Sequence, residues 1–330
     1  MAKQRENTWI VKRKQRQEAI KKIYTQNRSK LIGCLHQHLS STNRPLKGFI
    51  LLQTRELFRL LVWSEGDWFI LSHSNLMLNY WVFASKDIAT GNSILFVTRS
   101  LAGYILFFGE AKLLEYFNYL KETFMLHMVC YTDEIAEVLH AHHGGSEKPV
   151  LFLLHEQNTD SNNFCKPAKF KGMEEFETDL SVLHPILTEC RAIKSDAELF
   201  LIRYANDVSS KAHVEAMRNM RAGIFEIELR NIFLHHAFTN GDGCSITCIC
   251  ATGGNSSVLN YAHEAALNIW TFEDGDMALL DSGAEYNFHV SDITCSFPVN
   301  GKFTSDQKLI YNISREVYSR VTKGWWHLCW

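Results

Sequence analysis

The chain has 330 residues, of which 46% are hydrophobic and 21% charged, and its formal net charge at pH 7 is −2. This composition is typical of a folded protein with a real core, and the length allows two ordinary domains. A net charge so close to zero excludes a general attraction to nucleic acid or acidic membranes, so either partner would need a local basic patch.

Such a basic patch lies at the N-terminus, where residues 1–31 hold ten Lys or Arg against two Glu. The cluster at 12–16 could be a nuclear signal, the acid-poor composition could be a transit peptide, and nucleic-acid binding is a third reading. We favour a solvated leader over residues 1–23, open to disorder, with no nucleic-acid partner. No apolar signal segment follows it, so secretion is not indicated.

The apolar runs are short and the cysteines are scattered. No run is long enough to cross a bilayer, so we predict no membrane segment. Nine cysteines without clustering indicate reduced thiols in a cytoplasmic protein. Cys244, Cys248 and Cys250 lack a second pair of zinc ligands at finger spacing, so we interpret them as buried strand residues.

Residues 24–187 are expected to form an α/β domain. Short apolar runs at 48–52, 93–97 and 150–154 predict strands, and the pattern at 133–143 predicts a helix. The segment around Leu183 and Pro185 predicts a change of domain, so we place the boundary between residues 187 and 188.

Residues 188–330 are expected to form an incomplete α+β domain. Helices are predicted after Ser195 and after Gly223, and strands are predicted at 245–251, 276–283 and 287–297. Two helices followed by strands is the pattern of an α+β unit.

Asp281 lies in an otherwise apolar strand, where an ionised carboxylate requires a cation, hydrogen bonds or a raised pKa. If residues 285–287 form the turn, Asp281 and Asp292 lie directly opposite each other in a hairpin. Opposed carboxylates are close enough to share divalent metal ions that activate water for hydrolysis. The alternative is that Asp281 accepts backbone hydrogen bonds in a turn and Asp292 is a solvated strand residue.

Longer motifs resemble those of prolidases (Xaa-Pro dipeptidases), pita-bread metallopeptidases, and are closest to the plant-type sequences. The similarity extends over about residues 130–315. It rests on residues 281–286 (DSGAEY), 291–304 (SDITCSFPVNGKFT), 247–256 (TCICATGGNS), 183–191 (LHPILTECR), 205–215 (ANDVSSKAHVE) and, more weakly, 158–161 (NTDS).

The resemblance implies an α/β N-terminal domain like that of creatinase and aminopeptidase P, followed by part of an α+β pita-bread catalytic domain. It implies that Asp281 and Asp292 bind two Mn²⁺ ions, with Asp292 bridging them. It further implies that His263 holds the substrate and stabilises the tetrahedral intermediate, and that the substrate is a Xaa-Pro dipeptide. A structural histidine is the alternative for His263.

The sequence also departs from the prolidase pattern. Three further metal ligands of the family would follow Trp330, Asn260 replaces a usual His, and Ile246 replaces a Tyr near the substrate. The isolated chain is therefore expected to be inactive. It would be either a dipeptidase chain completed from elsewhere, or a non-catalytic chain that binds metal weakly or associates as a homo- or heterodimer with a full-length homologue.

Overall fold

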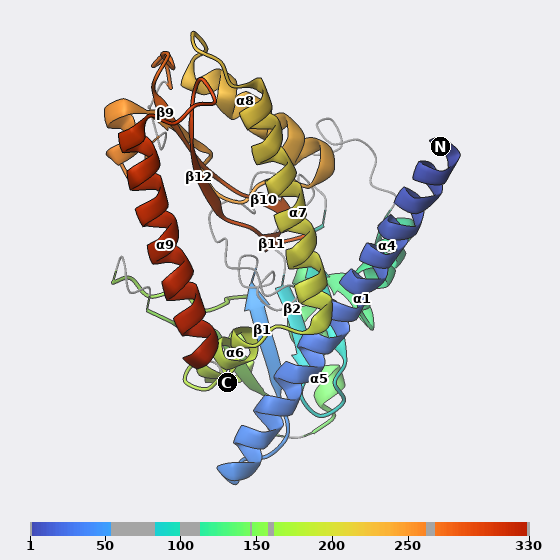
Figure 1. Cartoon of the computed structure of the whole chain (residues 1–330). Coiled ribbons are helices and arrows are strands. Elements are labelled where there is room, and N and C mark those ends of the chain that lie inside the picture. The colour runs from blue at the N-terminus through green and yellow to red at the C-terminus, as the bar shows by residue number, and fades with distance from the viewer. Residues whose placement is uncertain are drawn as a thin grey trace. The chain divides into compact units, whose positions relative to one another are not determined.

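The computed structural model describes residues 2–53, 83–99, 113–145, 147–157, 162–261 and 268–328 (Figure 1). The chain divides into two compact units. Unit 1 comprises Met1–Tyr204 with Asn287–His289, and unit 2 comprises Ala205–Tyr286 with Val290–Trp330. Among the described residues, no helix is both long and apolar enough to cross a membrane.

Unit 1 contains a six-stranded mixed sheet in the order β4-β3-β2-β1-β5-β6. Strand β2 runs antiparallel to β1 and β3, and the other neighbouring strands are parallel. The elements are α1 (Ala2–Ser41), β1 (Phe49–Gln53), β2 (Phe83–Asp87), β3 (Ser93–Val97), α4 (Leu113–Thr123), β4 (Met128–Tyr131), α5 (Ile135–His143), β5 (Val150–Leu153), β6 (Glu177–Asp179) and α6 (Leu183–Ala192), with short 3₁₀ turns at Thr132–Glu134 and Met173–Glu175.

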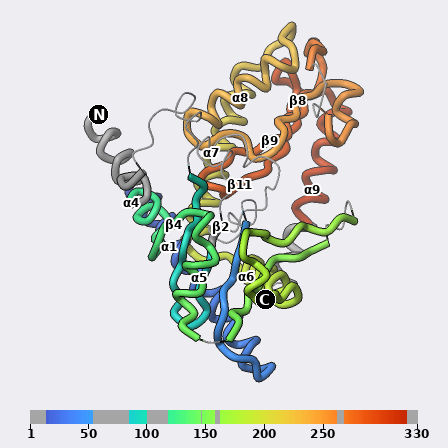
Figure 2. The backbone as a smooth tube through the Cα atoms, turned by 180° about the vertical axis from the view of Figure 1, so that it is seen from behind, coloured from blue at the N-terminus to red at the C-terminus, as the bar shows by residue number. Residues whose placement is uncertain are grey.

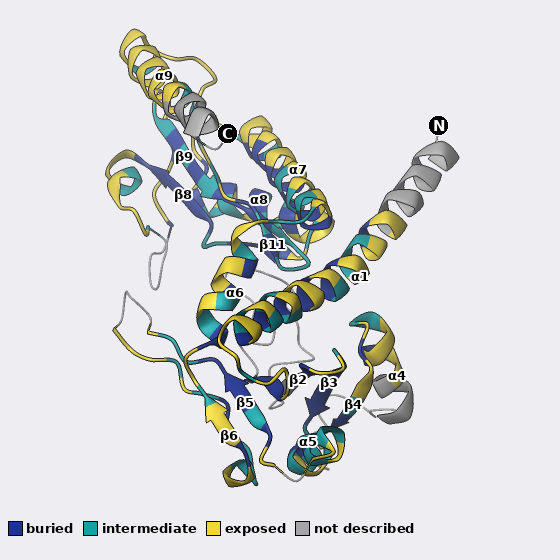
Figure 3. Ribbon diagram, turned by 90° about the horizontal axis from the view of Figure 1, so that it is seen from below, coloured by how far each residue is buried: buried dark blue, intermediate teal, exposed yellow. Residues whose placement is uncertain are grey.

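Helices cover both faces of this sheet, which explains why its central strands are continuous apolar runs. Along β1, Ile50 and Leu52 face a cluster that includes α1 and α6, whereas Phe49 and Leu51 face a cluster that includes α5. Strand β3 is buried throughout, and the edge strand β6 is mostly exposed (Figure 3). The strands and the helix predicted from the sequence in this unit are confirmed, with ends shifted by up to two residues.

Helix α1 is continuous from Ala2 to Ser41, so residues 2–23 of the predicted leader, which we left open to disorder, are helical. Leu31, Leu35 and Leu39 recur every four residues on one helical face and are fully buried against the sheet. Closer to the N-terminus of α1, the Arg16 guanidinium lies 4.1 Å from the centre of the Tyr204 ring. These contacts hold part of the basic N-terminal segment against the rest of unit 1.

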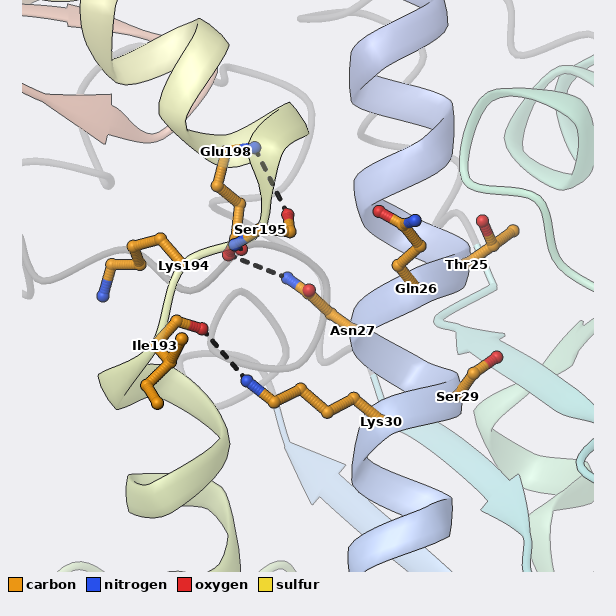
Figure 4. A pocket seen from close by; sticks show the side chains of 9 residues that line it. All are labelled: Thr25, Gln26, Asn27, Ser29, Lys30, Ile193, Lys194, Ser195 and Glu198. Atoms are coloured by element: carbon orange, nitrogen blue, oxygen red, sulfur yellow. Dashed lines mark hydrogen bonds between the residues drawn. The ribbon is translucent and has the colours of Figure 1, made fainter.

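Helix α1 is also tied to the segment that joins α6 to α7 (Asp196–Asn219) (Figure 4). Lys30 Nζ donates to the carbonyl oxygen of Ile193 at 3.0 Å, and Asn27 Nδ2 donates to Glu198 Oε1 at 3.3 Å. Glu198 is only 2% exposed, so its hydrogen bonds offset the cost of burying a carboxylate.

The units divide after Tyr204, inside α7, which differs from the predicted domain boundary between residues 187 and 188. Leu183 and Leu187 of α6 are buried in the core of unit 1, and the first turn of α7 bonds to α1. Helix α6 and the start of α7 therefore belong by packing to unit 1, although a loop pattern in the sequence suggested an earlier break.

Unit 2 holds two three-stranded sheets, in the orders β11-β10-β7 and β12-β9-β8. The pairs β7–β10, β8–β9 and β9–β12 run antiparallel, and Figure 2 shows β8 and β9 side by side. The predicted α+β order of helices followed by strands is confirmed. The elements after α7 are α8 (Glu226–Asn240), β7 (Gly243–Cys244), β8 (Ile249–Thr252), a 3₁₀ turn (Gly253–Ser257), β9 (Met277–Ser282), β10 (Ala284–Tyr286), β11 (His289–Val290), β12 (Ile293–Pro298) and α9 (Ser305–Leu328).

The packing of α1 predicts the effect of shortening one of its buried side chains. Leu35→Ala should lower the free energy of unfolding by about 2–5 kcal/mol, because it removes buried methyl groups and leaves a cavity. The exposed Lys22→Ala on the same helix should change it by no more than about 0.5 kcal/mol. Urea unfolding followed by circular dichroism measures both. Equal effects of the two substitutions would contradict the packing described for α1.

Candidate metal centre

The candidate site lies on the hairpin formed by β9 and β12. Asp281 of β9 pairs with Thr294, so the prediction that it lies directly opposite Asp292 is wrong by two residues. The turn falls at Asn287 and Phe288, with φ angles of 47° and 65°, and not at residues 285–287. Two successive left-handed residues are what a two-residue type I′ hairpin turn requires, but the usual Asn-Gly signal is absent.

A shift of two residues leaves both aspartates on the same side of the hairpin, because side chains alternate with a period of two. Asp292 is thus a diagonal neighbour of Asp281 and lies within hydrogen-bond reach of it. Partial burial and the negative charge of Asp281 raise the pKa of Asp292 above its usual value. The predicted proximity of the two carboxylates is confirmed.

Neighbouring strands fix the position of Asp281. Thr294 Oγ1 donates a hydrogen bond to Asp281 Oδ1 at 2.6 Å, and Ile249 of β8 pairs with Asp281 on its other side. Asp281 is half-buried and Asp292 is exposed. Since Asp292 is exposed, the described residues do not enclose the pair.

A serine network holds the backbone next to Asp292. Ser209 of α7 and Ser291 share a hydrogen bond of 2.6 Å, and the Ala284 amide donates to Ser209 Oγ at 2.6 Å. Ser245 Oγ donates to the Ser291 carbonyl oxygen at 2.5 Å. Because these groups are buried, a lost bond would leave a costly unpaired polar group. The role of Ser209 and Ser291 was not predicted from the sequence. The signal that could have indicated it is that Ser209 is a small polar residue on the otherwise apolar, inward face of the helix predicted after Ser195.

Gly283 allows this network to form. A Cβ atom on Gly283 would overlap the carbonyl oxygen of Ser291 and lie too close to the Ser245 hydroxyl. Only glycine permits so close a backbone approach, two residues along the chain from Asp281.

A second network surrounds the fully buried carboxylate of Glu226, at the start of α8. It accepts hydrogen bonds from the Thr252 amide at 3.0 Å, Asn255 Nδ2 at 3.1 Å and the Tyr261 hydroxyl at 2.6 Å. Burial and the adjacent carboxylate raise the pKa of Tyr261 to about 12. Sequence reasoning also missed Glu226. His263 lies outside the described residues, so its predicted role stays a prediction.

The donor chemistry of the aspartate pair suits a hard divalent cation such as Mg²⁺ or Mn²⁺, which prefers carboxylate oxygens. Two carboxylates do not complete a coordination sphere. Within the described part of the chain, no group of three or more His, Cys, Asp or Glu side chains is arranged to hold a metal ion. The described residues therefore offer a pair of carboxylates and no third ligand beside them.

The cysteines that resembled a zinc motif are structural. Cys244, Cys248 and Cys250 are 3%, 1% and 0% exposed, which confirms that they are buried. Cys244 and Cys250 lie in strands as predicted, whereas Cys248 directly precedes β8. Burial and the neighbouring thiols raise the pKa of Cys244 and Cys248, which keeps them protonated and poor metal ligands.

Residues 201–325 match metallopeptidase family M24. Two relatives named Xaa-Pro dipeptidase, from Pongo abelii and Homo sapiens, are 45% and 44% identical to the chain over 248 residues. These alignments cover 73% of the chain and 49% of each relative, so the chain spans about half the length of these relatives.

Solved aminopeptidase P structures share the fold. A variant of the Escherichia coli enzyme has a TM-score of 0.63 at 21% identity, and Pseudomonas aeruginosa aminopeptidase PepP has a TM-score of 0.65 at 19% identity. Each comparison covers 90% of this chain and 66% of the other. The predicted fold class, an N-terminal α/β domain followed by part of a pita-bread domain, is confirmed. Over residues 201–325 the chain belongs to metallopeptidase family M24, and it is similar to Xaa-Pro dipeptidases over about half of their length.

Proposed function

We propose that the chain carries part of the metal site of a Xaa-Pro dipeptidase, with Asp281 and Asp292 as ligands of two Mn²⁺ ions and Asp292 as the bridging ligand. The observation that carries this proposal is the contact of two like-charged side chains on one side of the hairpin. Such a pair is stabilised by a cation or a shared proton. Members of a metallopeptidase family use a divalent metal ion, which favours the cation.

The described residues position this pair. Thr294 fixes the orientation of the Asp281 carboxylate, and the bonds of Ser209 and Ser291 fix the backbone that carries Asp292. In an intact site of this kind, divalent ions activate water for peptide hydrolysis. We propose that His263 holds a Xaa-Pro dipeptide substrate there.

Hydrolysis of a Xaa-Pro dipeptide needs more metal ligands than the described residues bring together. We therefore propose that the 330-residue polypeptide by itself binds Mn²⁺ weakly and does not turn over substrate. We also propose a cytoplasmic location, which the eight free cysteines among the described residues support.

The ligand assignment predicts how charge removal affects metal binding. Asp281→Asn and Asp292→Asn should each weaken Mn²⁺ binding by about tenfold or more, because each removes a charged oxygen donor. Asp306→Asn, at an exposed acidic residue in the first turn of α9, should leave the affinity unchanged. Isothermal titration with MnCl₂ measures the three constants, and equal affinities would refute the assignment.

The proposed absence of turnover has its own test. The polypeptide of residues 1–330 incubated with Mn²⁺ and Gly-Pro should release no more proline than the Asp281→Asn variant, because too few ligands converge to hold the ions. Release of free proline measured by chromatography decides this. Mn²⁺-dependent cleavage that Asp281→Asn abolishes would overturn the proposed inactivity while supporting the ligand assignment.

A second candidate function is association with a full-length member of the family. Helix α9 favours it, because Ile310, Ile313 and Val317 recur on one helical face and are 65%, 54% and 56% exposed. Exposed apolar rows of this kind mark interaction surfaces. Since the relatives are about twice as long as the region matched here, we propose that the remaining part of a full-length relative covers this row.

The association proposal predicts a co-purifying complex. Tagged chain co-expressed with a full-length Xaa-Pro dipeptidase should capture it, and the double variant Ile310→Ser with Ile313→Ser should reduce capture by about fivefold or more, because it removes the central apolar contacts. The matched double variant Lys308→Ser with Asn312→Ser, on the opposite helical face, should capture normally. Equal capture by both double variants would exclude α9 as the contact.

A further inference from the structure

An open cavity of about 640 Å³ lies in unit 1, far along the chain from the aspartate pair. It is bordered by α1, by α4 and by the loop that leads into β4. Its volume lies within the range of small-molecule sites. Its lining residues are Lys21, Thr25, Asn118, Lys121, Glu122, Met125, Leu126 and His127.

The rim of this cavity is positively charged. Lys21 and Lys121 are exposed on it, Glu122 is its only acidic lining residue, and no ion pair joins either lysine to an acid in the described part of the chain. The pocket of Figure 4 differs, because its Lys30 Nζ already donates to two carbonyl oxygens and Glu198 lines it. Of these two pockets, only the cavity lined by Lys21 and Lys121 has lysine ammonium groups that are not already hydrogen-bonded to the described part of the chain.

Two further cations are buried close behind the rim. Arg28 is 3% exposed; its Nη2 donates to the Met125 carbonyl oxygen at 2.7 Å, and its Nη1 is buried without a hydrogen-bond partner. Lys86 is 5% exposed and donates to the Gly91 carbonyl oxygen at 2.9 Å. Burial lowers the pKa of Arg28 to about 10, and burial together with Arg28 lowers that of Lys86 to about 8. Buried like charges without a counter-ion are costly.

The buried cations are connected to the cavity by helix geometry and by hydrogen bonds. Lys21, Thr25 and Arg28 lie on successive turns of one face of α1, since they are four and three residues apart. Met125 both lines the cavity and accepts the hydrogen bond from Arg28. The positive field of the buried groups therefore reaches the cavity, where it would be offset by a bound anion.

His127 adds a directed donor. Its Nδ1 accepts a hydrogen bond from the Ser93 amide at 3.1 Å, so the ring proton of the neutral form resides on Nε2. Ser93 Oγ in turn accepts a hydrogen bond from Lys86 at 3.4 Å. Partial burial, followed by the nearby positive charges of Lys86, Arg28 and Lys121, lowers the pKa of His127 and favours this neutral form.

We propose that this cavity binds a small phosphate-class anion, free or carried by a small organic molecule, through Lys21, Lys121 and the Nε2 proton of His127. The ammonium groups supply charge and the imidazole supplies direction, as phosphate oxygens require. This site is independent of the metal ligands proposed in unit 2.

The test is calorimetric titration of the full 330-residue polypeptide with inorganic phosphate, at an ionic strength held constant with chloride. The double variant Lys21→Met with Lys121→Met should bind phosphate about tenfold or more weakly, because two charge-assisted contacts are lost. The matched double variant Lys22→Met with Lys47→Met removes two exposed lysines that do not line the cavity and should bind within about twofold of the parent, since exposed charges without direct contact are screened.

Lys86→Met provides a second readout. It should raise the thermal midpoint without phosphate, because a buried charge is removed, and it should reduce the upward shift that phosphate produces. If this variant does not fold, the comparison of the two double-lysine variants tests the proposal by itself. Glycerol 3-phosphate binding more tightly than inorganic phosphate would identify an organic ligand. No phosphate binding, or equal weakening in the two double-lysine variants, would overturn the proposal.

Discussion

The contact between Asp281 and Asp292 is the physical constraint on which the candidate site depends. Two carboxylates placed together repel each other unless a proton or a cation lies between them, and partial burial strengthens the repulsion. A folded chain that keeps this arrangement must stabilise it from the surrounding structure. Thr294 contributes to this stabilisation by donating a hydrogen bond to Asp281. The pairing of β9 with β12 fixes the position of Asp281 along the hairpin.

That register is itself supported by buried polar groups. Ser209 and Ser291 hydrogen-bond to each other and to the Ala284 backbone, and Gly283 leaves the room for Ser291 to approach. Because each buried donor and acceptor in this set has a partner, a slip of the hairpin would expose several unpaired groups at once. The site geometry is therefore fixed by its supporting residues as much as by its ligands.

A second group of like charges lies in unit 1, where the charges are positive. Arg28 and Lys86 are buried cations, and Lys21 and Lys121 are uncommitted cations on the cavity beside them. In both units the described residues place like charges close together, and the two proposed ion sites rest on this arrangement. The aspartates favour a divalent cation, and the lysines and arginine favour an anion of the phosphate class.

The sequence by itself determined much of the fold and the identity of the aspartates. Continuous apolar runs such as Ser93–Val97 are local signals, and the alternation of side chains placed Asp281 and Asp292 on one side of a hairpin regardless of a two-residue error in register. The tertiary structure decided the rest. The register depends on a turn at Asn287 and Phe288 without glycine, and the place of α1 in the fold depends on the packing of its buried leucines against the sheet. These features arise from contacts between residues far apart in the chain, which no local pattern encodes.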